Sequence, residues 1–415
     1  MYSKFLLLPI VSLIAASPAN ARPFAYVTNA GTHNVSVIDT ATNTVVATVE
    51  IGAATQPSGV AITPNGTFAY VANRDTFGGN TVSVINTSSN TVTATVPVGE
   101  APRGVATTPD GAFVYVTNSS FALGSVSVIN TVSNTVAATV TFGAGIGPLD
   151  IAITPSGAHA YVTNQLVGTV AIIDTSSNLI TSTVFVGGQA NGVAISPDGA
   201  RAYVSHVDTS NGSGTVSVIE TTNNTVTATI AVGMFPGGVA ITPDGVFAYV
   251  TNSGQATVSV IDTSSNTVAA TVAVGNDPRD VAITPDGAFA YVTNAFESHN
   301  VSVIETASNT VIDTVAVGTA PLAVAITPDL APDPHMLLQQ LHNDVEGVGP
   351  GTSLAEKIEL AQVYLTANDV PATCAVLTDF LNQVQAQRGK KLTAQQAADF
   401  TSKATAIMDA IGCVE

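Results

Sequence analysis

The chain has 415 residues, of which 46 % are apolar, enough for a sizeable buried core. Its 29 Asp and Glu residues outnumber its 11 Lys and Arg residues and give a net charge of −18. The stretch from Phe24 to Leu330 contains no lysine and only four arginines, which disfavours binding to nucleic acid or to anionic membrane surfaces.

The N-terminus has the features of a secretory signal. Lys4 precedes an apolar run from Phe5 to Ala16, and Ala19-Asn20-Ala21 forms an A-x-A cleavage site. We therefore expect residues 1–21 to be removed during export. The apolar run is too short to span a bilayer and no later run is long enough, so we expect no membrane insertion. The mature protein is expected in the periplasm, outside the cell or associated with the cell surface.

The sequence Tyr-Val-Thr-Asn, or a close variant of it, recurs seven times along the chain. It begins at Tyr26, Tyr70, Tyr115, Tyr161, Tyr203, Tyr249 and Tyr291. The intervals are 44, 45, 46, 42, 46 and 42 residues, a period typical of radial or linear repeat arrays. Each repeat contains four short segments rich in Val, Ile, Thr and Tyr between turn signals, which predicts four antiparallel strands. In the sixth repeat these segments are 238–242, 247–251, 258–261 and 267–272.

The two ends of the repeat array are complementary. The array begins at Phe24 with a second strand that has no first strand before it. It ends at residues 321–328 with a first strand that has no second strand after it. A linear solenoid would need distinct capping repeats, and none is visible. We therefore predict an all-β, seven-bladed β-propeller over residues 22–330, whose ring is closed by the C-terminal first strand.

The repeated Tyr-Val-Thr-Asn, the Thr-Pro-Asp-Gly turns and Val-Ser-Val-Ile-Asp-Thr resemble the YVTN family of seven-bladed β-propellers. The resemblance covers about residues 24–330. It implies an exported or surface-layer-associated protein, and many members of that family lack an assigned activity. Related propellers include lactonase-like and quinone-cofactor enzymes, so the resemblance does not exclude catalysis. Because the chain has no tryptophan, it does not fit the tryptophan-bearing propellers that dock quinones, and we expect no cofactor.

The loop between the second and third strands varies in length. The first valine of the third strand follows the Tyr-Val-Thr-Asn sequence after 6, 9, 8, 6, 10, 6 and 7 positions in the seven repeats. The loop from the fourth strand into the next blade also varies, and in an antiparallel blade both loops emerge on one face. Loops on a rigid scaffold often carry recognition, so we predict a binding face there; the alternative is relaxed constraint on surface loops. Its candidate contacts are Arg74, Phe77, Phe121, Leu123 and Asp208.

A second candidate site lies near the mouth of the central channel, where the first strands begin. Arg103 and Arg279 stand there in Pro-Arg-Gly-Val and Pro-Arg-Asp-Val. The other polar residues of the equivalent segments are Asp150, Asn191, Asp277 and Asp280. Such a ring of charges could bind a small molecule, and the alternative is a set of mutually paired surface charges. The six histidines show no metal-ligand spacing, so we expect no metal.

From about His335 the sequence pattern becomes helical, and residues 331–415 are predicted to form a bundle of three or four helices. The predicted helical segments are 336–345, 353 to about 367, one opening at Pro371, and one capped by residues 393–396. The chain's two cysteines, Cys374 and Cys413, both lie in this region. In an exported protein an isolated pair favours a disulfide over a metal or redox site.

The pattern from Cys374 through Phe380 and Gly389 to Cys413 resembles the FIMAH-type helical domain that ends many exported bacterial proteins. The match covers about 80 residues. That domain has no established catalytic role, so the resemblance implies an accessory or tethering module.

Two functions follow from the sequence. The first is an exported, non-enzymatic binding or structural protein, a monomer whose variable loops contact a protein or glycan of the cell envelope. The alternative is a lactonase-like hydrolase that works at the channel mouth with acidic side chains and Arg103 or Arg279. Catalysis requires a group placed to transfer a proton, and the sequence shows no such constellation, which favours the binding protein.

Overall fold

The structure is a computed structural model that describes residues 23–52, 55–75, 80–329, 334–346, 348, 353–367 and 369–413. Contacts within the chain separate a unit of Arg22–Asp329 from a second unit that begins at Leu330. The predicted signal segment, residues 1–21, lies outside the described residues.

The first unit is a seven-bladed β-propeller, as predicted, and each blade is a four-stranded antiparallel sheet. Each first strand contacts the first strand of the next blade, so the seven first strands form the inner wall of the ring. These first strands are β28 (Pro321–Ile326), β4 (Thr55–Ile62), β8 (Pro102–Thr107), β12 (Pro148–Ile153), β16 (Gln189–Ile195), β20 (Pro236–Ile241) and β24 (Pro278–Ile283). The second strands are β1 (Phe24–Asn29), β5 (Phe68–Asp75), β9 (Phe113–Asn118), β13 (His159–Asn164), β17 (Arg201–Val207), β21 (Phe247–Asn252) and β25 (Phe289–Asn294).

The third and fourth strands complete each blade toward the outside. The third strands are β2 (Asn34–Asp39), β6 (Thr81–Asn86), β10 (Ser125–Asn130), β14 (Thr169–Asp174), β18 (Gly214–Glu220), β22 (Thr257–Asp262) and β26 (Asn300–Glu305). The fourth strands are β3 (Thr44–Glu50), β7 (Thr91–Pro97), β11 (Thr135–Thr141), β15 (Leu179–Phe185), β19 (Thr225–Val232), β23 (Thr267–Ala273) and β27 (Thr310–Ala316).

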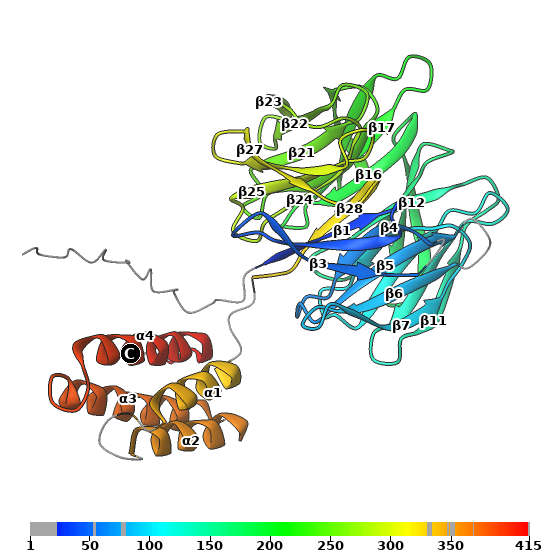
Figure 1. Ribbon diagram of the computed structural model, residues 1–415. Coiled ribbons are helices and arrows are strands. Elements are labelled where there is room, and N and C mark those ends of the chain that lie inside the picture. The colour runs from blue at the N-terminus through cyan, green and yellow to red at the C-terminus, as the bar shows by residue number, and fades with distance from the viewer. Residues whose placement is uncertain are drawn as a thin grey trace, which may run out of the picture. The chain divides into compact units, whose positions relative to one another are not determined.

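The predicted ring closure is confirmed. The first blade has the strand order β28-β1-β2-β3, so the last strand of the array supplies the first strand of the first blade. Ala25 pairs with Ile326 and Val27 with Val324, and Figure 1 shows β1 and β28 side by side. The Thr-Pro-Asp-Gly turns have side-chain and backbone geometry suited to a tight turn: the N–H of Val246 donates to the Asp244 carboxylate, and Gly245 has a φ of 75°.

The tyrosines of the repeat join consecutive blades. Seven apolar clusters, each drawn from two neighbouring blades, fill the spaces between the sheets, and each contains one buried tyrosine. In six of the seven, the tyrosine hydroxyl also donates to an asparagine in the hairpin between the third and fourth strands of the next blade. These donor and acceptor pairs are Tyr26–Asn90, Tyr70–Asn134, Tyr115–Asn178, Tyr161–Asn224, Tyr249–Asn309 and Tyr291–Asn43, at 2.5–2.8 Å.

The seventh junction lacks this hydrogen bond. The hydroxyl of Tyr203 and the side-chain oxygen of Asn266 are buried and have no partner among the described residues. At this junction Arg201 donates instead to the backbone oxygen of Thr263, at 2.9 Å. The chain thus contains its own control for the tyrosine–asparagine bond.

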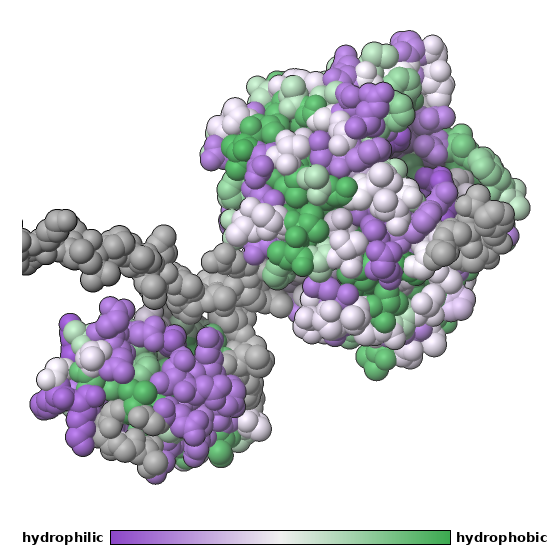
Figure 2. Space-filling view, in the orientation of Figure 1, coloured by the Kyte–Doolittle hydropathy of each residue, from purple (hydrophilic) through white to green (hydrophobic). Residues whose placement is uncertain are grey.

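The second unit contains four helices: α1 (Pro334–Val345), α2 (Ser353–Thr366), α3 (Val370–Gln387) and α4 (Ala394–Ile411). The predicted cap of the last helix is present, because the N–H of Gln396 donates to the Thr393 hydroxyl and the N–H of Thr393 donates to the Gln396 side chain. None of the described helices is both long enough and apolar enough to cross a membrane. Figure 2 shows that the visible face of this unit is mostly hydrophilic.

A disulfide joins Cys374 in α3 to Cys413, which follows α4, as predicted. Around it the four helices share one apolar core that includes Leu338, Ile358, Phe380 and Phe400. A crosslink that closes a loop of this size, with 39 residues of sequence separation, adds about 4 kcal/mol to stability on the chain-entropy model.

We expect Tyr161→Phe to lower the free energy of unfolding by about 1–2 kcal/mol, because it leaves the Asn224 side-chain oxygen without its donor. The matched control, Tyr203→Phe, removes a hydroxyl that has no partner and should change the free energy by less than about 0.5 kcal/mol. Urea unfolding monitored by circular dichroism measures both. Equal losses for the two variants would show that the bond between blades contributes nothing.

We also expect a chain that ends at residue 320 to lose cooperative melting of the propeller. It lacks β28, so β1 becomes an unpaired edge and the cluster between the seventh and first blades is opened. The control is a chain that ends at Asp329, which lacks the helical unit but keeps β28. Calorimetry should show a cooperative transition for the control only, and a cooperative transition for both chains would contradict closure by β28.

Candidate functional site

The inner wall of the propeller has a repeated irregularity at its entrance. In each first strand the pairing with the second strand shifts register just after the first residues, as between Pro102 and Val105 or between Pro278 and Val281. Two residues per blade are thereby left out of the ladder and line the channel. We call them the first and second channel positions.

The residues at these two positions differ from blade to blade. The first channel positions hold Leu322, Ser58, Arg103, Leu149, Asn191, Gly237 and Arg279. The second channel positions hold Ala323, Gly59, Gly104, Asp150, Gly192, Gly238 and Asp280. All of them line one cavity of about 410 Å³, together with the rim residues Gln165, Gln189, Val207, Phe235, Pro236, Ser253 and Pro278. The scaffold is nearly identical in the seven repeats, whereas the channel residues differ in charge and size.

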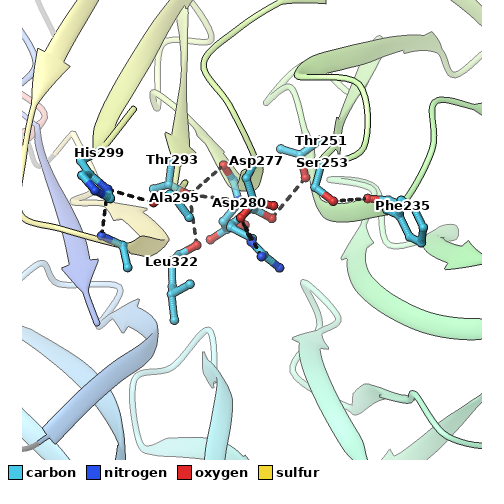
Figure 3. Close-up of polar contacts among 11 residues, drawn as sticks. Phe235, Thr251, Ser253, Asp277, Asp280, Thr293, Ala295, His299 and Leu322 are labelled. Carbon is cyan, nitrogen blue, oxygen red and sulfur yellow. Dashed lines mark hydrogen bonds and ion pairs between the residues drawn. The ribbon is translucent and has the colours of Figure 1, made fainter. Parts of the chain in front are cut away.

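In six of the seven blades a hydroxyl of the second strand fixes the channel positions. Thr163 accepts the N–H of Asp150 in its own blade and donates to the backbone oxygen of Asn191 in the next blade, at 2.6 Å. Thr293 likewise donates to Leu322, as Figure 3 shows. Blade two has Ala72 at this place, and there the hydroxyl of Ser58 donates to the next blade instead, to the backbone oxygen of Pro102. The channel positions are therefore held by the ring and not by mobile loops.

Asp150 and Asp280 bridge neighbouring first strands. The carboxylate of Asp150 accepts the N–H of Val193 in the next blade at 2.9 Å, and that of Asp280 accepts the N–H of Val324 at 3.0 Å. Desolvation inside the channel raises the pKa of Asp150 to about 6 and that of Asp280 to about 7, against the lowering effect of these N–H donors. The charge of Asp150 adds to the rise at Asp280. Both carboxyl groups thus change protonation near neutral pH.

Arg279 and Arg103 occupy the same channel position in two blades but have different surroundings. Arg279 makes an ion pair with Asp277, in which Nε and Nη2 of the guanidinium both donate to Oδ2 of the carboxylate, at 2.9 and 2.7 Å. Arg103 makes no side-chain hydrogen bond or ion pair with the described residues, and its Nε is buried without a partner. Desolvation lowers the pKa of Arg103 to about 10, with smaller contributions from the charges of Arg74 and Arg279. At neutral pH the channel therefore contains an unneutralised guanidinium.

The structure divides the sequence-predicted site residues into two groups. The cavity brings together Arg103, Asp150, Asn191, Arg279 and Asp280. The alternative prediction was that these charges pair with one another at the surface. It holds for Arg279, which pairs with Asp277, but not for Arg103.

The loop residues do not line the cavity. Phe121 and Leu123 lie in the loop between β9 and β10 and are 79 % and 53 % exposed. Asp208 accepts hydrogen bonds from Ser210 within its own loop. Arg74 donates to Gln56, and Phe77 lies outside the described residues.

Sequence reasoning missed the apolar part of the rim. Phe235 lines the cavity and Met234 beside it is exposed, but their loop has the same length as most of its equivalents, so loop length gave no signal. Leu149 and Leu322 were missed as well, because only the charged and polar residues of these segments were candidates for the site. Alignment of the two channel positions across the repeats would have found both leucines.

No curated protein matches the sequence. Two family models match parts of it: the one described as lactonase, 7-bladed beta-propeller, over residues 128–315, and the one described as cytochrome D1 heme domain, over residues 19–138. Neither spans half of the chain. The resemblances to the YVTN family and to the FIMAH-type domain stay predictions.

Two solved structures share the propeller fold. Hydrazine synthase of Kuenenia stuttgartiensis is 26 % identical, with a TM-score of 0.61, and the alignment covers 68 % of this chain and 92 % of that one. A functionally unknown protein from Desulfotomaculum acetoxidans is 18 % identical, with a TM-score of 0.64, over 74 % of this chain and 99 % of that one. The second likeness shows the fold alone.

The cavity residues do not fit a haem. Among the described residues that line it there is no His, Cys, Met or Tyr, the side chains that usually bind haem iron. Nor do the described parts of the chain bring together three or more His, Cys, Asp or Glu side chains where they could hold a metal ion. The ionisable and amide groups that the described residues bring to the cavity are the unpaired guanidinium of Arg103, the paired guanidinium of Arg279, the carboxyl groups of Asp150 and Asp280, and a few amides.

Proposed function

We propose that the protein is an exported, non-enzymatic binding protein whose ligand occupies the channel mouth. The observation that carries this is the contrast within the repeats: the scaffold positions are nearly constant, while no two blades have the same pair of channel residues, and all these residues line one cavity. A cavity of about 410 Å³ suits a small molecule or the end of a larger one. The predicted signal segment and the disulfide support export.

The loops around the cavity extend this site. Phe121 and Phe235 are both exposed on connections of the face on which the channel opens, and Phe296 lies on a third such connection with 63 % of its surface accessible. Aromatic side chains on rigid scaffolds provide contact area at a low entropy cost, and they stack on sugar rings or on other apolar groups. The proposed partner is therefore a glycan or protein of the cell envelope, with the cavity as its anchor.

Filling the cavity tests this proposal. We expect Leu322→Trp to abolish ligand binding, because Leu322 lines the cavity and the much larger indole side chain would fill the channel mouth. The control is Leu179→Trp, at an exposed site on the outer strand β15. Native mass spectrometry with a panel of monosaccharides, sugar acids, amino acids and envelope-derived oligosaccharides should find a compound that binds the wild type and the control but not Leu322→Trp. Equal binding by all three proteins would contradict the site.

Lactone hydrolysis is the second candidate function. Two observations favour it: the match to the lactonase family model spans residues 128–315, and Asp280 within that span has a pKa of about 7. The ionised Asp280 would take a proton from water as the oxygen attacks the lactone carbonyl, and Arg103 would stabilise the oxyanion. The ring C–O bond would then break, and the proton would return from Asp280 to the leaving oxygen. The product is a hydroxy acid.

This candidate makes a clear kinetic prediction. Because the base must be ionised, kcat/KM for lactones such as glucono-δ-lactone should rise with pH, reach half of its maximum near pH 7 and then level off. Asp280→Asn should remove this activity. A pH-stat assay corrected for spontaneous hydrolysis measures the rate. A rate at pH 7 that equals the spontaneous one eliminates hydrolysis and leaves the binding function in place.

A further inference from the structure

The repeats contain two arginines at the same channel position, and only one of them has an internal partner. In the seventh blade the sequence is Asp277-Pro278-Arg279, and the Asp277 carboxylate binds the guanidinium through two hydrogen bonds. In the third blade the sequence is Ala101-Pro102-Arg103. Asp277 and Ala101 share the left-handed backbone conformation, with φ of 55° and 52°. The third blade thus has the backbone of this ion pair without its carboxylate.

No other carboxylate of the described chain takes that place. Glu100 is the nearest in sequence, and its side chain accepts a hydrogen bond from Ser120 at 2.9 Å. Asp150 in the adjacent first strand is bonded to Val193, and no ion pair joins it to Arg103. A desolvated guanidinium without a partner is unfavourable, and it gains most from an anion that reaches it inside the cavity.

We propose that Arg103 binds the carboxylate of a small ligand and that this carboxylate occupies the place that Asp277 takes beside Arg279. The inference rests on the proposed function, since it assigns a ligand class to the same cavity. A planar carboxylate can accept from two donors of one guanidinium. In the pair that this chain already contains, Nε and Nη2 of Arg279 both donate to Oδ2 of Asp277.

The rest of the cavity narrows the class of ligand. Asp150 and Asp280 line the same cavity and accept hydrogen bonds, so they favour a ligand that also carries a hydroxyl or ammonium donor. A phosphate dianion carries twice the negative charge and is repelled more strongly by these carboxylates. The ligand class is therefore a hydroxy- or amino-substituted monocarboxylate.

Matched acid and amide pairs test this assignment on the full chain. The probes are gluconate with gluconamide, lactate with lactamide and glycine with glycinamide, plus inorganic phosphate, measured by calorimetry. We expect at least one acid to bind about ten- to a hundred-fold more tightly than its amide, the effect of one charged hydrogen-bonded pair. Arg103→Gln should abolish this preference, whereas Arg201→Gln, outside the cavity, should keep it.

A second variant introduces a carboxylate of the chain itself beside Arg103. Ala101→Asp places an aspartate at the position of Asp277, where it should pair with Arg103 and displace the acid, and aspartate tolerates the left-handed backbone there. The matched control is Ala320→Asp, which has the same position and a φ of 51° but precedes Leu322 instead of an arginine. It should leave acid binding unchanged.

The outcomes separate this inference from the proposed function. Loss of acid preference in Arg103→Gln and Ala101→Asp, but not in their controls, supports the assignment. Binding that Leu322→Trp abolishes but Arg103→Gln does not alter overturns the assignment and keeps the binding site. Tighter binding of phosphate than of any acid also overturns it. If none of these probes binds, and no compound of the wider panel binds either, both the carboxylate assignment and the proposed binding function are contradicted.

Discussion

Every blade of this propeller is apolar on both faces, and that constraint determines the rest of the structure. A sheet of this kind is stable only between two neighbours, so the array must close on itself or expose an apolar face at each end. The clusters between the blades supply the burial, and the tyrosine hydroxyls add a directional bond from each blade to the hairpin of the next at six of the seven junctions. Closure by β28 follows directly, and it fixes the inner wall from which the channel residues project.

The fold could be predicted from the sequence because seven copies repeat one pattern. The split copies at Phe24 and at residues 321–328 gave the closure, and Cys374 and Cys413 gave the disulfide. The tyrosine–asparagine bond was not predicted, although both residues recur at nearly constant spacing, because a repeat shows that a residue is required and not what it contacts. The exception at Tyr203 could not be foreseen, since Tyr203 and Asn266 are both present in the sequence.

The candidate site was predicted only in part, for a related reason. Position in the repeat places Arg103 and Arg279 together in the channel, but their different ionic states depend on contacts. Asp277 lies two residues before Arg279, and the ion pair by which it neutralises that arginine is visible only in the folded structure. The two carboxyl groups could be located by alignment, whereas their raised pKa values come from the desolvation that the closed ring imposes. Rigid repeats thus fix where side chains lie, and single departures from the repeat create the chemistry.

The role proposed for Arg103 is to bind the carboxylate of a ligand inside the channel. The most direct measurement is a crystal structure of the protein grown with an excess of a carboxylate that binds it, at a resolution that shows the guanidinium plane. We expect density for the carboxylate against the Arg103 guanidinium, in the arrangement that Asp277 has with Arg279. A carboxylate of the chain itself paired with Arg103, or ligand density away from the channel, would contradict the account.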